Sequence, residues 1–79
     1  MEFLVDLNKV EDVKEFVKYA STYDTVVSVS NQDRNFVVDG SSLMGLFSLD
    51  LSKPVVVHIN SNDVAQSFGK DVEKFILKK

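Results

Sequence analysis

Side chains that could act as nucleophiles, bases or metal ligands are few in this chain and widely spaced. Its 79 residues include no cysteine and one histidine, His58. Without cysteine, neither a disulfide framework nor a thiolate metal site can form. His58 stands between Val57 and Ile59, so in a strand its side chain points to the face opposite theirs. No motif builds a Ser-His-Asp set around it, and no spacing of His and carboxylates predicts a metal site.

Adjacent carboxylates and isolated glycines also carry no catalytic signal. Glu11 and Asp12 are neighbours, and adjacent helix positions point about 100° apart, which does not make an acid–base pair. We interpret them as carboxylates that complement the dipole at a helix start. The three glycines, Gly40, Gly45 and Gly69, form no phosphate-binding loop. The sequence therefore predicts no catalytic residue, no metal site and no cofactor, and we expect that the chain is not an enzyme.

The segment from residue 40 to residue 51 combines hydroxyl groups with a high density of apolar side chains. Ser41 and Ser42 follow Gly40 and can cap a short helix, whose first N–H groups would tolerate a phosphoryl group there. Plain capping is the alternative interpretation. The apolar residues that follow are too many for one face of a short helix: Leu43, Met44, Leu46, Phe47, Leu49 and Leu51. Some must be core, and exposure of the remainder would be typical of a protein-binding patch.

Length, charge and hydropathy limit the class of protein. The chain is long enough for one domain, residues 1–79, and its apolar content of 44% is ordinary for a globular domain. A net charge of −3 does not suit nucleic-acid phosphates. The one basic group, Lys74, Lys78 and Lys79, is typical of a helix C-terminus. No signal peptide and no run of about 20 apolar residues is present. We therefore expect a cytoplasmic protein that binds neither nucleic acid nor membrane.

The first half of the chain predicts a strand, a helix and a hairpin. Residues 2–7 have strand-like content. Asn8, with Glu11 three residues later, has the spacing of a capping box, and the helix that it opens is expected to end near Thr22. Two short strands then flank the turn signal Asn-Gln-Asp and predict a hairpin, at residues 26–30 and 36–38.

The second half predicts a short helix, a strand and a longer helix. The short helix follows Ser42, and residues 55–59 form a strand rich in β-branched side chains. The final helix presents one apolar stripe, made of Val64, Phe68, Val72, Phe75 and Ile76. The element order is therefore βαββαβα. It predicts an α+β fold in which three helices cover one face of a four-stranded antiparallel sheet.

Residues 42–49 read Ser-Leu-Met-Gly-Leu-Phe-Ser-Leu and resemble a known regulatory segment. This is the regulatory-serine segment of the histidine-containing phosphocarrier protein (HPr) family of the bacterial phosphotransferase system, which in Gram-positive members reads Lys-Ser-Ile-Met-Gly-Val-Met-Ser-Leu. Residues 16–21 look like the end of the family's first helix, 26–38 like its hairpin and 55–59 like its last strand. The element order is also the family's. The resemblance covers nearly the whole chain and implies an HPr-like open-faced β-sandwich.

The histidine that accepts phosphate in this family has no counterpart here. The family carries a Gly-Leu-His-Ala-Arg-Pro loop between its first strand and first helix. In this chain residues 7–12 read Leu-Asn-Lys-Val-Glu-Asp, and residues 1–57 contain no histidine. His58 lies in a different strand. The chain is similar in kind to the catabolite-repression HPr-like proteins, which lack the histidine and keep the regulatory serine.

The resemblance implies a regulatory or interaction module of the phosphoenolpyruvate-dependent sugar phosphotransferase system, without histidine phosphocarrier activity. It makes Ser42 the candidate regulatory phosphorylation site, and it makes Leu43, Met44 and Phe47 the candidate partner-binding patch. The implied partners are phosphotransferase-system enzymes, HPr kinase or a transcriptional regulator. Two alternatives stay open: a phosphocarrier with an unusual acceptor such as His58, and a diverged scaffold domain that shares only the fold.

Overall fold

The elements follow one another in the order predicted from the sequence. A computed structural model describes residues 2–77 of the chain, with a short 3₁₀ turn at Glu73–Phe75 after the last helix. The strands are β1 (Glu2–Val5), β2 (Val27–Ser30), β3 (Val37–Asp39) and β4 (Val55–Ile59). The helices are α1 (Val10–Ala20), α2 (Leu43–Phe47) and α3 (Asn62–Asp71).

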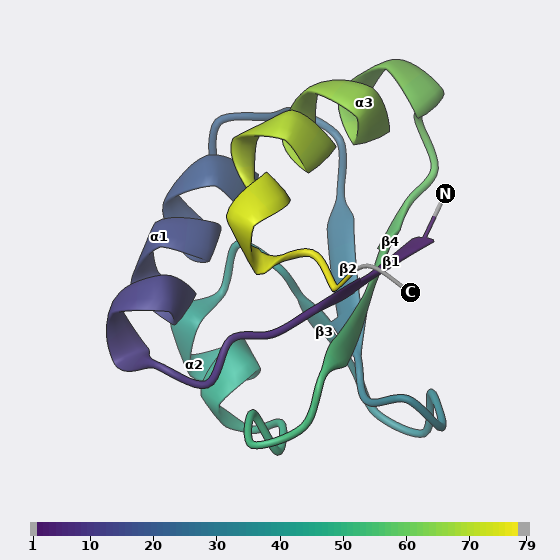
Figure 1. The fold of residues 1–79 in the computed structure, drawn as a ribbon. Helices are drawn as coiled ribbons and strands as arrows, with labels where there is room; N and C mark the ends of the chain where they lie inside the picture. The colour runs from purple at the N-terminus through teal and green to yellow at the C-terminus, as the bar shows by residue number, and fades with distance from the viewer. Residues whose placement is uncertain (1, 78–79) are drawn as a thin grey trace.

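The four strands form one antiparallel sheet, as expected, in the order β1-β4-β2-β3. The hairpin of β2 and β3 is confirmed, and β4 lies between β1 and β2. Side chains alternate across the sheet: Val55, Val57 and Ile59 of β4 are buried, whereas His58 is exposed. Figure 1 shows the three helices together on one side of the sheet. Val55, Val57 and Ile59 belong to the same buried core as Phe16 of α1 and Phe68 of α3. The other face is left without helices.

Aromatic rings join the two long helices above the sheet. Helix α1 buries Val13, Phe16 and Ala20, which share one helical face. The ring of Phe16 meets that of Phe68 of α3 edge-on, with centroids 5.3 Å apart. Tyr23, in the loop after α1, also packs edge-on against Phe68 and donates a hydrogen bond to Asp71 Oδ2 (2.5 Å). That carboxylate raises the pKa of Tyr23.

The first strand and the first helix differ from the prediction at their junction. β1 ends at Val5, which pairs with Val55 at the start of β4, and the N–H of the next residue, Asp6, donates to the carbonyl of Phe75 (2.8 Å). Leu7 turns into the core and is 1% exposed. The helix consequently begins after Lys9, an extended residue without a side-chain cap. The capping box predicted for Asn8 is therefore wrong.

The end of the chain does not continue as one helix. Helix α3 ends at Asp71, and the backbone angles at Val72 (φ −109°, ψ 18°) lead into the 3₁₀ turn. Ile76 is extended and forms an antiparallel bridge with Val5, while Leu77 N donates to the carbonyl of Leu4 (2.9 Å). β1 is an edge strand, so its outer N–H and C=O groups have no partner strand, and residues 76 and 77 pair with them. Ile76 was therefore wrongly placed on the helical stripe.

The basic group near the C-terminus is also only partly as expected. Lys74 lies in the 3₁₀ turn, where its ammonium group pairs with Glu15 Oε2 of α1 at 2.5 Å. That hydrogen bond raises the pKa of Lys74. Lys78 and Lys79 lie outside the described residues. Lys74 thus ties the chain end to α1.

Substitution of Leu46 and of Met44 tests whether α2 packs against the core through Leu46. Leu46 is fully buried and Met44 is 84% exposed. Leu46→Ala should lower the free energy of unfolding by about 2–5 kcal/mol, because it leaves a cavity in the core. Met44→Ala should change it by less than about 0.5 kcal/mol. Urea denaturation followed by circular dichroism measures both, and equal losses would show that α2 does not pack as described.

Candidate functional site

Ser42 caps the short helix through its side chain. Its backbone is extended (φ −102°, ψ 111°), and its hydroxyl oxygen accepts a hydrogen bond from Gly45 N at 3.1 Å. Its carbonyl accepts from Leu46 N at 3.0 Å and closes the first helical turn. A Cβ on Gly45 would lie 3.1 Å from the Ser42 hydroxyl oxygen, which is tighter than an ordinary contact. The cap expected at Ser42 is thus confirmed, and a glycine leaves room for it.

The neighbouring Ser41 is bound in a different way. Its backbone N–H and its hydroxyl both donate to Asp39 Oδ1, at 2.9 and 2.7 Å, and these bonds lower the pKa of Asp39. Gly40, between them, lies so close to β2 that a Cβ there would stand 2.8 Å from the Val27 side chain. Glycine is therefore required for the chain to leave β3 and enter α2. The two serines are separated in role: Ser41 binds a carboxylate and Ser42 caps a helix.

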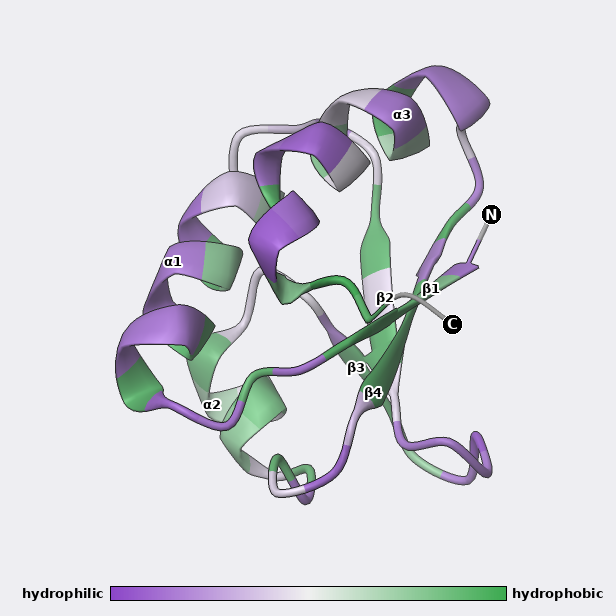
Figure 2. Cartoon of the chain, in the orientation of Figure 1, coloured by the Kyte–Doolittle hydropathy of each residue, from purple (hydrophilic) through white to green (hydrophobic). Residues whose placement is uncertain are grey.

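The apolar residues of α2 divide between core and surface. Leu46 and the following Leu49 are buried. Met44 and Phe47 are 84% and 46% exposed, although α2 as a whole is hydrophobic (Figure 2). Leu43 is half-buried and packs against the core cluster. Of the three residues predicted as a partner-binding patch, the structure therefore places Met44 and Phe47 on the surface, whereas Leu43 is partly buried against the core.

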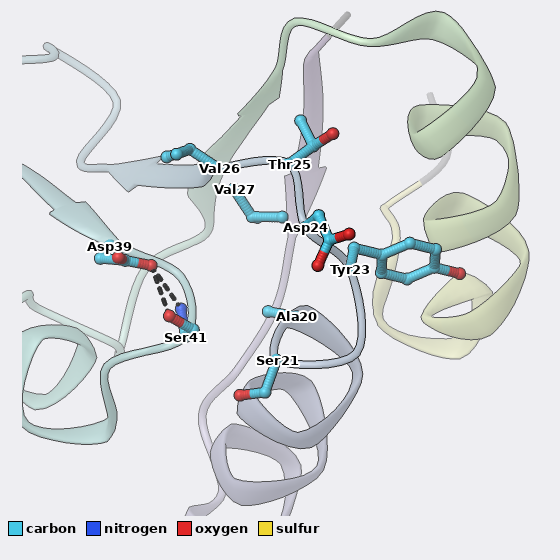
Figure 3. Close-up of a pocket in the computed structure, with 9 residues that line it drawn as sticks. All are labelled: Ala20, Ser21, Tyr23, Asp24, Thr25, Val26, Val27, Asp39 and Ser41. Carbon is cyan, nitrogen blue, oxygen red and sulfur yellow. Dashed lines mark hydrogen bonds between the residues drawn. The ribbon is translucent and has the colours of Figure 1, made fainter.

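A surface hollow of about 270 Å³ lies beside the Asp39–Ser41 turn. Figure 3 shows Ser21 and Asp24 of the α1–β2 connection on its other side, with the ring of Tyr23 directed away from Asp39. Asp24 and Thr25 are lining residues that we did not single out from the sequence. Nothing in the sequence pairs Asp24 with Asp39, since only the folding of β2 against β3 brings the two segments together.

A second polar cluster occupies the face of the sheet that carries no helix. The register places Glu2, His58 and Ser28 in one row across β1, β4 and β2. Arg34, from the loop between β2 and β3, binds both carboxylate oxygens of Glu2, with Nη2–Oε1 at 2.7 Å. The Arg34 guanidinium, with a smaller contribution from His58, lowers the pKa of Glu2 to about 2. Strand alternation could have placed Glu2 and His58 on the same face of the sheet, but no sequence signal indicated that Arg34 would bind Glu2.

The one histidine is thus part of a surface cluster. His58 Nδ1 lies 3.4 Å from Glu2 Oε2, and its Nε2 donates to Asn60 Oδ1 at 2.9 Å. Among residues 2–77 no three His, Cys, Asp or Glu side chains are grouped so that they could hold a metal ion. No helix in the same stretch is long and apolar enough to cross a membrane.

Comparison with known proteins adds no family assignment. No model of a known protein family matches the chain. A search of curated protein sequences also finds no match.

Removal of the Ser42 hydroxyl should weaken α2. Ser42→Ala should lower the free energy of unfolding by about 1 kcal/mol, because Gly45 N loses its acceptor. Ser42→Asp keeps a side-chain acceptor and should stay close to the native value. Ser41→Ala is the matched control and should change stability by less than about 0.5 kcal/mol. Thermal and urea unfolding measure all three. Equal losses in Ser41→Ala and Ser42→Ala would contradict the assigned roles.

The Glu2–Arg34 pair should make stability depend on acid. The pKa of Glu2 is about 2 in the folded chain, against an ordinary value of 4.5. Because the folded pKa is the lower one, the pair contributes its full stabilisation above about pH 4.5 and loses it as the pH falls toward about 2. Glu2→Gln should therefore be less stable than the native chain near neutrality, and the difference should shrink in acid. Titration of the Glu2 carboxyl by NMR gives the midpoint directly, and a midpoint near 4.5 would refute the pair.

Proposed function

We propose that this chain is an HPr-like regulatory or interaction module of the phosphoenolpyruvate-dependent sugar phosphotransferase system that does not carry a phosphoryl group on histidine. Ser42 is its regulatory phosphorylation site. The exposed side chains of Met44 and Phe47, with the partly buried Leu43, form its partner-binding patch. The module is not an enzyme. Its partners are phosphotransferase-system enzymes, HPr kinase or a transcriptional regulator, and it works in the bacterial cytoplasm.

The observation that carries this proposal is the arrangement on α2. A serine caps the helix, and within one turn and a half the same helix exposes a methionine and a phenylalanine. Ser42 uses its hydroxyl oxygen as an acceptor, so the cap does not consume the hydroxyl proton. The βαββαβα order and the motif in residues 42–49 support the same assignment.

The histidine relay is not supported by the surroundings of any histidine in the chain. Glu11 and Asp12 occupy the first turn of α1, where their negative charges would repel an incoming phosphoryl group. His58 lies on the far side of the sheet from α2 and has the Glu2 carboxylate 3.4 Å from its Nδ1. A phosphoryl group at that nitrogen would meet the same repulsion.

Modification of Ser42 would act mainly on binding. A phosphate adds about two negative charges beside an apolar surface, which changes the class of partner that the surface fits. Its effect on the fold should be smaller, because the first N–H groups of the helix attract the phosphate while Asp39, three residues upstream, repels it. Ser42 is therefore proposed as a switch of partner choice.

The proposal is tested by phosphorylation of the purified chain. A bacterial HPr kinase with ATP should add one acid-stable phosphate, which disappears in Ser42→Ala and remains in Ser41→Ala, as read by mass spectrometry. Phosphoenolpyruvate with the general phosphotransferase enzyme should add no acid-labile phosphate. The phosphorylated chain and Ser42→Asp should then differ from the native chain in binding to the cognate regulator.

Authentic HPr in the same reactions serves as the positive control. An acid-labile phosphate that is lost in His58→Ala would replace the proposal with a phosphocarrier. A kinase that modifies authentic HPr and leaves this chain untouched would support the scaffold alternative.

A further inference from the structure

We propose that the helix-free face of the sheet holds a binding site for a small organic carboxylate with an apolar body. In this structure the chain's own Glu2 occupies the head-group position. The site consists of Arg34, His58, Ser28 and Ser30 together with Val37 and Val56, and these residues line a hollow of about 200 Å³. It lies on the opposite face of the sheet from α2, and it does not depend on the function proposed above.

The first argument is the way in which Arg34 is held. Arg34 has a φ of 63° and is the one described residue with a positive φ, a conformation that is unfavourable for residues with a Cβ. Its N–H donates to the carbonyl of Asn31 (3.0 Å), and Gln32 Nε2 donates to the carbonyl of Pro54 (3.2 Å). The loop is thereby held beside Pro54, at the start of β4. From there the guanidinium reaches the row of Glu2 and His58.

The second argument is an unused polar group inside the hollow. Ser30 is 7% exposed and lines the hollow, and within residues 2–77 no hydrogen bond engages its hydroxyl. That hydroxyl keeps some access to solvent, because the described residues contain no sealed polar side-chain atom without a partner. A buried hydroxyl normally finds a partner in the folded chain. Here it is free to bond to a ligand.

The Glu2 carboxylate bound to Arg34 indicates the chemical class of the ligand. A carboxylate fits the fork of Arg34 with two parallel bonds, and Glu2 makes that contact. Glu2 is 37% exposed at its side chain, so an external carboxylate can exchange with it. Val37 and Val56 lie beside the charged groups, and Val37 is 60% exposed. An acid with an apolar body would cover those valines, which an inorganic anion would not.

Benzoate is the probe, with acetate for the head group alone and sulfate as an anion without an apolar body. Amide NMR of the native chain should show saturable benzoate shifts at Ser28, Ser30 and Val56, and weaker effects from acetate and sulfate. Glu2→Gln removes the carboxylate that competes for Arg34. It should raise benzoate affinity about fivefold, because an exposed ion pair of ordinary strength leaves Arg34 unpaired for only a minor fraction of the time. Arg34→Asn, which tolerates the positive φ, should abolish the saturable shifts.

The matched control is Glu11→Gln, which makes the same charge change on the helical layer and should leave benzoate affinity unchanged. The proposal fails if Glu2→Gln and Glu11→Gln bind benzoate equally well, or if the saturable shifts survive in a folded Arg34→Asn. It also fails if sulfate binds more tightly than benzoate, since Val37 and Val56 would then have no part in recognition.

Discussion

Strand β4 is the element on which the rest of the sheet depends, because β1 and β2 both pair with it. Its alternation decides what each face of the domain contains. Val55, Val57 and Ile59 turn toward the helices and meet the apolar sides of α1 and α3, while Val56 and His58 turn to the opposite face. A shift of one residue in this register would exchange the two sets and expose the core. The core and the Arg34 cluster are thus fixed by the same pairing.

The short helix shows how a small domain can present an apolar surface without losing its core. Helical spacing places Leu46 inward and turns Met44 and Phe47 outward, and the next buried side chain, Leu49, comes only after the helix has ended. The turn that enters this helix is equally constrained, since Gly40 packs directly against β2. The exposed side chains therefore belong to a helix whose entry turn and inner face are both packed against the rest of the fold.

Local patterns in the sequence were sufficient for the element order and the hairpin, and they indicated that some of the apolar residues that follow Ser42 must be core, but not which ones. They failed where distant segments meet. The side chain of Leu7 is buried in the core, and α1 begins only after it. Ile76 pairs with Val5 and is not part of α3. The Glu2–Arg34 contact joins the first strand to the β2–β3 loop. The hollow beside Asp39 is lined by two segments that lie far apart in the sequence. The candidate residues on α2 came from a motif, whereas these contacts depend on strand order, which periodicity does not reveal.

The pairing of residues 76 and 77 with β1 bears on whether a second chain could add a strand to this sheet. An unpaired edge strand is a template on which a second chain can add a strand and begin aggregation. Here one edge of the sheet is partly occupied by hydrogen bonds from Leu77 N and Asp6 N, which hold the chain end against β1. The other edge, β3, is three residues long and carries a charge at Asp39. Short length and charge discourage intermolecular strand addition there, so the sheet discourages self-association at both of its margins by different means.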